Sequence, residues 1–193
     1  MNRLIVFEGI DGVGKTTMSK SLTEWLRANG IPAVRYEDVE DARAGFNLIK
    51  PFIRENVQIE GSLLFYLSSA IYKSSRIDEL LKEKWVICDR YVFSTIGDHL
   101  SRGSIVASSS LIEKLPIRMP DYTFLLVADE VDRALRNRER PDQKKDDLLT
   151  KDDAPRLSLM EEELMRHADS IIDTSDGASE TFSIIIQKIK QFL

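Results

Sequence analysis

The chain has 193 residues, which fits one domain with at most a small lid or insertion. Its hydrophobic fraction of 42% supports a sizeable core and excludes disorder along the whole chain. The balance of 32 acidic against 27 basic residues argues against a protein that binds a nucleic-acid polymer or a membrane surface through basic patches. Cys88 is the single cysteine and cannot form an internal disulfide bond. No signal-peptide pattern or membrane-length apolar run is present, so we expect a cytoplasmic protein.

Short β-branched runs alternate with longer amphipathic stretches along the chain. We expect strands at 4–7, 32–36, 85–88, 122–127 and 170–173. We expect helices at 14–29, 45–55 and 61–84, after Arg90, at 129–138, around His167 and at about 178–191. This order predicts an α/β fold over 1–193, in which a five-stranded parallel sheet lies between two layers of helices.

Residues 136–153 interrupt this alternation, because they are rich in charge and show almost no apolar periodicity. We interpret them as an exposed, mobile, arginine-containing lid within the domain. The alternative is a solvated surface connection without a function.

A phosphate-binding motif, G-x-x-x-x-G-K-[ST], lies between the first expected strand and the first expected helix. Its residues are Gly9, Ile10, Asp11, Gly12, Val13, Gly14, Lys15 and Thr16. Glycines let the backbone curl so that its N–H groups point at phosphate oxygens, and the helix N-terminus adds positive potential. Lys15 would contact the β- and γ-phosphates, and the Thr16 hydroxyl would bind magnesium. A tight glycine turn without a ligand is the alternative.

The strand expected at 85–88 is followed directly by Asp89 and Arg90. A carboxylate at the carboxyl end of a strand next to the phosphate loop is suited to hold magnesium or to orient an acceptor. An arginine beside it can grip a phosphate with two hydrogen bonds. Alternatively, Asp89 caps the next helix and Arg90 pairs with a surface carboxylate.

Several segments resemble the thymidylate kinase family, a group of P-loop NTPase-type nucleoside monophosphate kinases. They read F-E-G-I-D-G-V-G-K-T-T at 7–17, L-L-F at 63–65, D-R-Y-V-F-S-T at 89–95 and P-D-Y-T-F-L-L-V at 120–127. The resemblance implies that ATP, with Mg²⁺, phosphorylates a nucleoside monophosphate, with dTMP to dTDP as the expected reaction. It also implies a homodimer, while no nucleic-acid polymer or membrane is expected as a partner.

The same resemblance implies roles for individual residues. The residues expected to bind ATP are Gly9, Asp11, Gly12, Val13, Gly14, Lys15, Thr16, Thr17 and Arg136. The residues expected to bind the acceptor are Asp11 at the sugar hydroxyl, Phe65 stacked on the base, Ser69, Arg90 at the phosphate, Ser94, Thr95 and Asp98. Thr16 and Asp89 would hold magnesium. Lys15, Asp89, Arg90 and a lid arginine, for which we select Arg140, would carry the catalysis, because Gly12 leaves the loop without an arginine.

Three positions on the acceptor side depart from the family pattern. After the second strand the chain has Glu37 and Asp38 in place of an arginine-containing segment, and Arg43 and Arg54 are candidate substitutes. Ser69 replaces an arginine that reads the base, and Asp98 replaces an aromatic residue near the sugar. Two alternatives therefore remain open: a related kinase with another (deoxy)nucleotide or nucleoside acceptor, and a nucleotide-binding switch without kinase activity.

Overall fold

The computed structural model describes residues 1–39, 44–138 and 154–193. Five strands form one parallel sheet in the order β2-β3-β1-β4-β5. They are β1 (Leu4–Glu8), β2 (Ala33–Arg35), β3 (Trp85–Asp89), β4 (Tyr122–Val127) and β5 (Ser170–Asp173). The expected five-stranded parallel sheet is confirmed. β2 is shorter than expected, because the chain turns at Tyr36 into a short 3₁₀ helix, η1 (Tyr36–Asp38).

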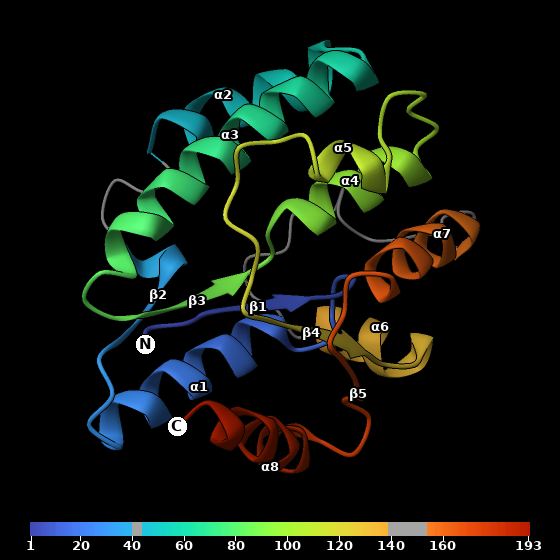
Figure 1. Ribbon diagram of the computed structural model, residues 1–193. Helices are drawn as coiled ribbons and strands as arrows, with labels where there is room; N and C mark the ends of the chain where they lie inside the picture. Colours follow the sequence, from blue (N-terminus) through green and yellow to red (C-terminus); the bar gives the residue numbers. More distant parts are fainter. Residues whose placement is uncertain (40–43, 139–153) are drawn as a thin grey trace.

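Helices cover both faces of this sheet (Figure 1). In the described part of the chain they are α1 (Lys15–Ala28), α2 (Ala44–Asn56), α3 (Ile59–Leu80), α4 (Val92–Ser101), α5 (Ser109–Ile112), α6 (Glu130–Arg138), α7 (Ala154–Met165), α8 (Ala178–Ile189) and the 3₁₀ helix η4 (Lys190–Phe192). α1 and α8 pack together on one face, while α3 and α4 lie on the other, with α2 outside α3 (Figure 1). The expected three-layer arrangement is therefore present.

The core lies on and around the central strand β1. Leu4, Ile5, Val6 and Phe7 are fully buried, and the Phe7 ring stacks on Phe124 of β4 at 5.2 Å between centroids. Burial on both faces explains why β1 has an unbroken apolar sequence instead of an alternating one. Within the described ranges, no helix combines the length and apolarity needed to cross a membrane.

Parallel pairing brings the carboxyl ends of β1 and β3 side by side, with Phe7 opposite Asp89. The phosphate loop follows β1, and the Asp89–Arg90 turn follows β3. Two sequence motifs that are far apart in the chain therefore meet at one edge of the sheet, where ligands of open α/β sheets bind.

Candidate active site

The phosphate loop curls tightly between β1 and α1. Gly9, Gly12 and Gly14 have φ angles of 139°, 89° and 90°, which side chains rarely tolerate. A Cβ atom on Gly12 would also lie 2.9 Å from the carbonyl oxygen of Arg133 in α6. The loop therefore depends on glycine at this position for its backbone angle and for the close approach of α6.

Lys15 opens α1 and turns back over the loop. Its Nζ donates to the carbonyl oxygen of Ile10 at 2.6 Å and lies 3.9 Å from the carboxylate of Asp11. Burial lowers the pKa of Lys15 to about 7, and the positive charge of Arg90 acts in the same direction. An anion bound in the loop would favour the charged ammonium again.

The Thr16 hydroxyl donates to Asp89 Oδ2 at 2.5 Å. This bond joins the first turn of α1 to the end of β3, and both residues line a common cavity. Hydroxyl and carboxylate oxygens are the ligands that Mg²⁺ prefers, and Mg²⁺ in kinases takes few protein ligands beside substrate phosphates. These two side chains therefore fit a magnesium ion.

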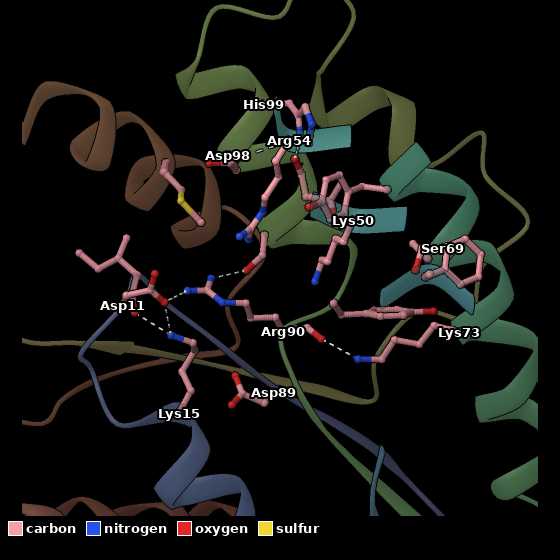
Figure 2. Close-up of a pocket in the computed structure, with 18 of the residues that line it drawn as sticks. Asp11, Lys15, Lys50, Arg54, Ser69, Lys73, Asp89, Arg90, Asp98 and His99 are labelled. Carbon is pink, nitrogen blue, oxygen red and sulfur yellow. Dashed lines mark hydrogen bonds and ion pairs between the residues drawn. The ribbon is translucent and has the colours of Figure 1, made fainter. Parts of the chain in front are cut away.

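Arg90 faces the phosphate loop. Its guanidinium donates to Asp11 Oδ1 at 2.6 Å and to Ser94 Oγ at 2.9 Å, as Figure 2 shows. Its partner Asp11 belongs to the phosphate loop and has a side chain that is 64% exposed. The alternative in which Asp89 caps the next helix is wrong, since the N-cap residue of α4 is Tyr91 and no side-chain hydrogen bond caps this helix.

Glu8 is the last residue of β1, and its side chain bonds to the segment that begins α4. It is fully buried, accepts a hydrogen bond from Tyr91 N at 2.8 Å, and accepts another from the Ser94 hydroxyl. Burial raises the pKa of Glu8, and the Ser94 hydrogen bond opposes this rise. Glu8 therefore fixes Ser94, which in turn accepts from Arg90.

A cavity of about 810 Å³ begins at the phosphate loop and extends between α2, α3 and α4 (Figure 2). A volume of this size suits a nucleotide-sized ligand. The predicted residues that line it are Asp11, Lys15, Thr16, Phe65, Ser69, Asp89, Arg90, Ser94, Thr95 and Asp98. The structure thus brings every predicted acceptor and magnesium residue to one cavity.

Aromatic rings gather on the α2–α3 side of the cavity. Phe65 lies 5.7 Å from Phe46 and 5.3 Å from Tyr66, measured between ring centroids. Tyr66 in turn lies 5.7 Å from the buried ring of His99. Phe46 was not identified from the sequence, because its position depends on how α2 packs on α3.

Additional basic residues line the same cavity. They are Lys50 and Arg54 on α2, Lys73 on α3, Arg102 after α4 and Arg156 on α7. With Lys15 and Arg90 they make seven basic side chains, against the four carboxylates of Asp11, Glu37, Asp89 and Asp98 in the same lining. The described walls therefore favour an anionic ligand. Arg54, one of the two substitutes considered from the sequence, does lie here; Arg43 is outside the described residues.

Asp98 does not stand alone on the cavity wall. Its carboxylate lies 3.4 Å from Arg102 and 3.3 Å from Arg156. The Arg156 pair joins α4 to the first turn of α7. Ser69 lies on the α3 wall, between Phe65 and Lys73 on the same helix face.

The other residues predicted for ATP lie outside the cavity lining. Gly9, Gly12, Val13, Gly14 and Thr17 belong to the loop or the first turn of α1. Arg136 donates to the hydroxyl and to the carbonyl oxygen of Thr174, at 2.7 and 2.8 Å, just after β5. Of the expected lid only 136–138 are described, as the end of α6, and Arg140 lies outside the described residues.

The amino-acid sequence is similar to a known protein family and to individual known proteins. The thymidylate kinase family profile matches residues 7–183. A probable thymidylate kinase of Methanococcus maripaludis (strain C7) is 30% identical over 204 aligned residues, which cover 100% of both chains. One of Pyrococcus abyssi is 34% identical over 131 residues, or 63% of each chain.

A solved structure shows the same fold. The crystal structure of thymidylate kinase from Ehrlichia chaffeensis superposes with a TM-score of 0.69 at 22% identity, and the match covers 98% of both chains. The family match spans far more than half of the chain and includes both the phosphate loop and the Asp89–Arg90 turn. The chain belongs to the thymidylate kinase family.

Proposed function

We propose that the chain transfers the γ-phosphoryl group of ATP to a nucleoside monophosphate, with dTMP as the acceptor and dTDP as the product. The observation that carries this proposal is the single cavity that joins Lys15, Thr16 and Asp89 at one end to Phe65 and Asp98 at the other. A transferase needs donor and acceptor sites that open into each other, whereas a switch needs only the first. The chain's membership of the thymidylate kinase family supports dTMP as the acceptor.

At the donor end, the phosphate loop and Lys15 bind the β- and γ-phosphates, and Arg136 also binds ATP. Magnesium held by Thr16 and Asp89 offsets the charge of the phosphates. Lys15, whose pKa is lowered to about 7 by burial, becomes more fully charged as the phosphates enter. Transfer then depends on positioning and electrostatics more than on covalent chemistry by the protein.

At the acceptor end, the Asp11 carboxylate accepts a hydrogen bond from the sugar hydroxyl. Phe65 stacks on the base, and Ser94 and Thr95 line the base pocket. Arg90 contacts the acceptor phosphate and the group in transfer. Its present bond to Asp11 keeps the guanidinium in place between the two substrates. Lys50 and Arg54 enter the cavity from α2 with their nitrogen ends directed toward Arg90 (Figure 2), and we assign the acceptor phosphate to this pair as well.

We retain Arg140 as the arginine that stabilises charge on the transferring phosphoryl group. The packing of Gly12 against Arg133 supports a source outside the loop, because no side chain fits at Gly12. Replacing Arg140 with alanine should lower turnover much more than ATP affinity. An Arg140→Ala enzyme with unchanged turnover would remove that residue from the mechanism.

The proposal is tested by ADP release from Mg-ATP with dTMP, dUMP, UMP, CMP, dCMP, AMP, GMP and buffer alone. A strong preference for dTMP supports the proposal in full. Transfer to another monophosphate keeps the kinase and replaces the acceptor. ATP binding without transfer to any of them would contradict the proposal and favour a nucleotide-binding switch.

A second acceptor class has its own support. The Asp98 carboxylate lies on the cavity wall and can accept a hydrogen bond from a hydroxyl group of a ligand. A ribonucleoside monophosphate such as UMP offers one more hydroxyl than its deoxy counterpart. Comparing UMP with dUMP in the panel isolates this hydroxyl, since the two acceptors have the same base and phosphate.

We also propose a cytoplasmic homodimer. Large apolar side chains are exposed on α2 and α3, namely Leu48, Phe52 and Leu64, and these helices form the outer part of one face (Figure 1). Burial of such a patch against a second copy would stabilise a dimer. Light scattering after gel filtration measures the mass directly, and Phe52→Glu should shift a dimer toward monomer.

A further inference from the structure

Lys73 and Glu37 form an ion pair behind the Asp89–Arg90 turn. Lys73 Nζ lies 3.2 Å from Glu37 Oε1, and the two side chains are only 12% and 10% exposed. Glu37 comes from η1, the short helix that follows β2, and Lys73 comes from α3. The pair therefore connects two elements across the carboxyl edge of the sheet.

Each partner also holds the main chain of the turn. Glu37 Oε2 accepts a hydrogen bond from Asp89 N at 3.1 Å, and Lys73 Nζ donates to the carbonyl oxygen of Arg90 at 2.8 Å. The two hydrogen bonds are made by the N–H of Asp89 and the carbonyl oxygen of Arg90, so they lie on either side of the Asp89–Arg90 peptide bond. The side chain of Asp89 faces Thr16, and the side chain of Arg90 faces Asp11 and Ser94.

The topology explains why Glu37 is needed. Trp85 N donates toward the β2 side, to Pro32, whereas Val86 N and Arg90 N donate toward the β1 side, to Arg3 and Phe7. Since N–H groups alternate along a strand, Asp89 N faces the β2 side. β2 ends at Arg35, opposite Ile87, so no strand backbone reaches Asp89 N. The Glu37 carboxylate takes that place.

Lys73 is itself held in a defined position. Its ammonium lies 4.6 Å from the ring centroid of Tyr36 and 5.7 Å from that of Tyr91. The cation–π contacts and the carboxylate partner hold the ammonium group in place. Arg90 has a φ angle of 69°, a conformation that a non-glycine residue keeps only where its surroundings impose it.

We propose that the Glu37–Lys73 pair is a positioning device that sets the Asp89–Arg90 peptide, so that Asp89 meets Thr16 and Arg90 enters the cavity. The roles of Asp89 and Arg90 that this device serves rest on the proposed function. The acidic residue that stands after β2 thus acts on the main chain of the catalytic turn, and not on the acceptor phosphate. Both residues act through Asp89 and Arg90 and need not contact a substrate.

The test compares Lys73→Met, Lys73→Arg and Glu37→Gln with the wild-type enzyme, using turnover and the Mg²⁺ concentration that gives half-maximal rate. Loss of an outer partner of a metal ligand typically weakens metal use about 10–100-fold. We expect Lys73→Met to lower turnover and raise the Mg²⁺ requirement within that range. Lys73→Arg, which retains the charge and donors, should recover most of the loss. Glu37→Gln keeps the size of the side chain but not the ion pair, and should lie between the two.

Arg76→Met is the matched control. Arg76 is on the same helix, is partly exposed, and pairs with Glu79 at the surface, so its loss should leave both readouts unchanged. Circular dichroism establishes which variants are folded, and Glu37→Gln carries the test if Lys73→Met does not fold. A folded Lys73→Met with wild-type Mg²⁺ dependence would overturn the inference, even if its turnover were lower.

The proposed function fails in a different way. If the wild-type enzyme transfers phosphate to no monophosphate, the kinase assignment is wrong. If the wild-type enzyme is active while Lys73→Met and Glu37→Gln match it in turnover and Mg²⁺ requirement, the kinase assignment stands and the positioning role is wrong.

Discussion

The Thr16 hydroxyl donates to Asp89 Oδ2 across 2.5 Å, although 73 residues separate the two in the chain. The bond turns two oxygen atoms toward the same point beside the phosphate loop. One oxygen comes from the start of α1 and the other from the end of β3, so the geometry of the sheet sets their spacing. Both residues line the cavity, so an ion held by this pair would be open to a ligand bound there.

Removing the hydroxyl at this position should weaken the use of magnesium. We expect Thr16→Val to raise the half-saturating Mg²⁺ concentration by about tenfold or more, because one of two protein ligands is lost. Thr16→Ser keeps the hydroxyl and serves as the control. Initial rates over a Mg²⁺ titration measure the effect, and equal titration curves for the valine and serine variants would contradict the magnesium site.

Nucleotide binding should take up a proton at Lys15. The pKa of Lys15 in the free protein is lowered to about 7, and bound phosphates raise it. At pH 8 most free protein therefore carries a neutral Lys15, which must be protonated on binding, whereas at pH 6 little uptake remains. ATP affinity should accordingly fall as pH rises above about 7.

Calorimetry at pH 8 in two buffers of different ionisation enthalpy measures this uptake. Lys15→Arg is the informative control, because arginine stays protonated and should bind ATP without the linked proton. Identical heats in the two buffers for the wild-type protein would show that Lys15 is already charged. Lys15→Ala should abolish transfer altogether.

The cations of α2 should act on the acceptor and not on ATP. Removing a hydrogen bond to a charged group costs about 1.5–3 kcal/mol, or roughly tenfold or more in affinity. We therefore expect Arg54→Met and Lys50→Met to raise the KM of the acceptor monophosphate by about tenfold or more, with the KM of ATP nearly unchanged. Lys82→Met, which removes an exposed charge beyond the end of α3, should change neither. A rise in the KM of ATP instead would place these residues at the donor end.

Alanine substitutions at two glycines with nearly equal φ angles should distinguish the cost of backbone strain from the cost of a steric contact. Gly12 and Gly103 have φ angles of 89° and 87°, but only a Cβ on Gly12 meets other atoms, at Arg133. Gly103→Ala should cost about 1–2 kcal/mol of unfolding free energy from backbone strain alone. Gly12→Ala should cost a further 1–3 kcal/mol, roughly, from the contact with α6.

Urea denaturation of the two variants gives both values. Equal losses would mean that α6 yields easily at Arg133, and that the loop does not depend on this close approach.

Features of the fold and the site that depend on a short stretch of sequence could be predicted. The phosphate loop was recognised because glycine spacing, lysine and threonine act within eight consecutive residues, and β1 and β3 were recognised because each begins with a continuous apolar run. Asp89 and Arg90 could be placed beside the loop since parallel strands end at the same edge. All of these inferences depend on local pattern plus one general rule of α/β topology.

The other features of the site could not be predicted, because they depend on how elements that are distant in the chain pack together. Arg54 was one of two candidate substitutes in the sequence and Lys50 was not a candidate, because only the position of α2 along the cavity places these two residues in the site. The contact between Asp98 and Arg156 of α7, which lies 58 residues further along the chain, is one example. Glu37 was interpreted by its place in a family motif, whereas its role follows from the point at which β2 ends. Contacts between distant segments leave no periodic pattern in the sequence.

Arg90 also illustrates how activity and stability oppose each other at one position. Its left-handed backbone, with a φ angle of 69°, costs about 1–2 kcal/mol for any residue with a Cβ. A design aimed only at a stable protein would place glycine there. The chain instead has a less stable turn that places a guanidinium between the phosphate loop and the cavity. Thermostabilising substitutions selected without an activity screen would therefore favour glycine at this residue, and would remove the charge to which the proposed function assigns phosphate binding.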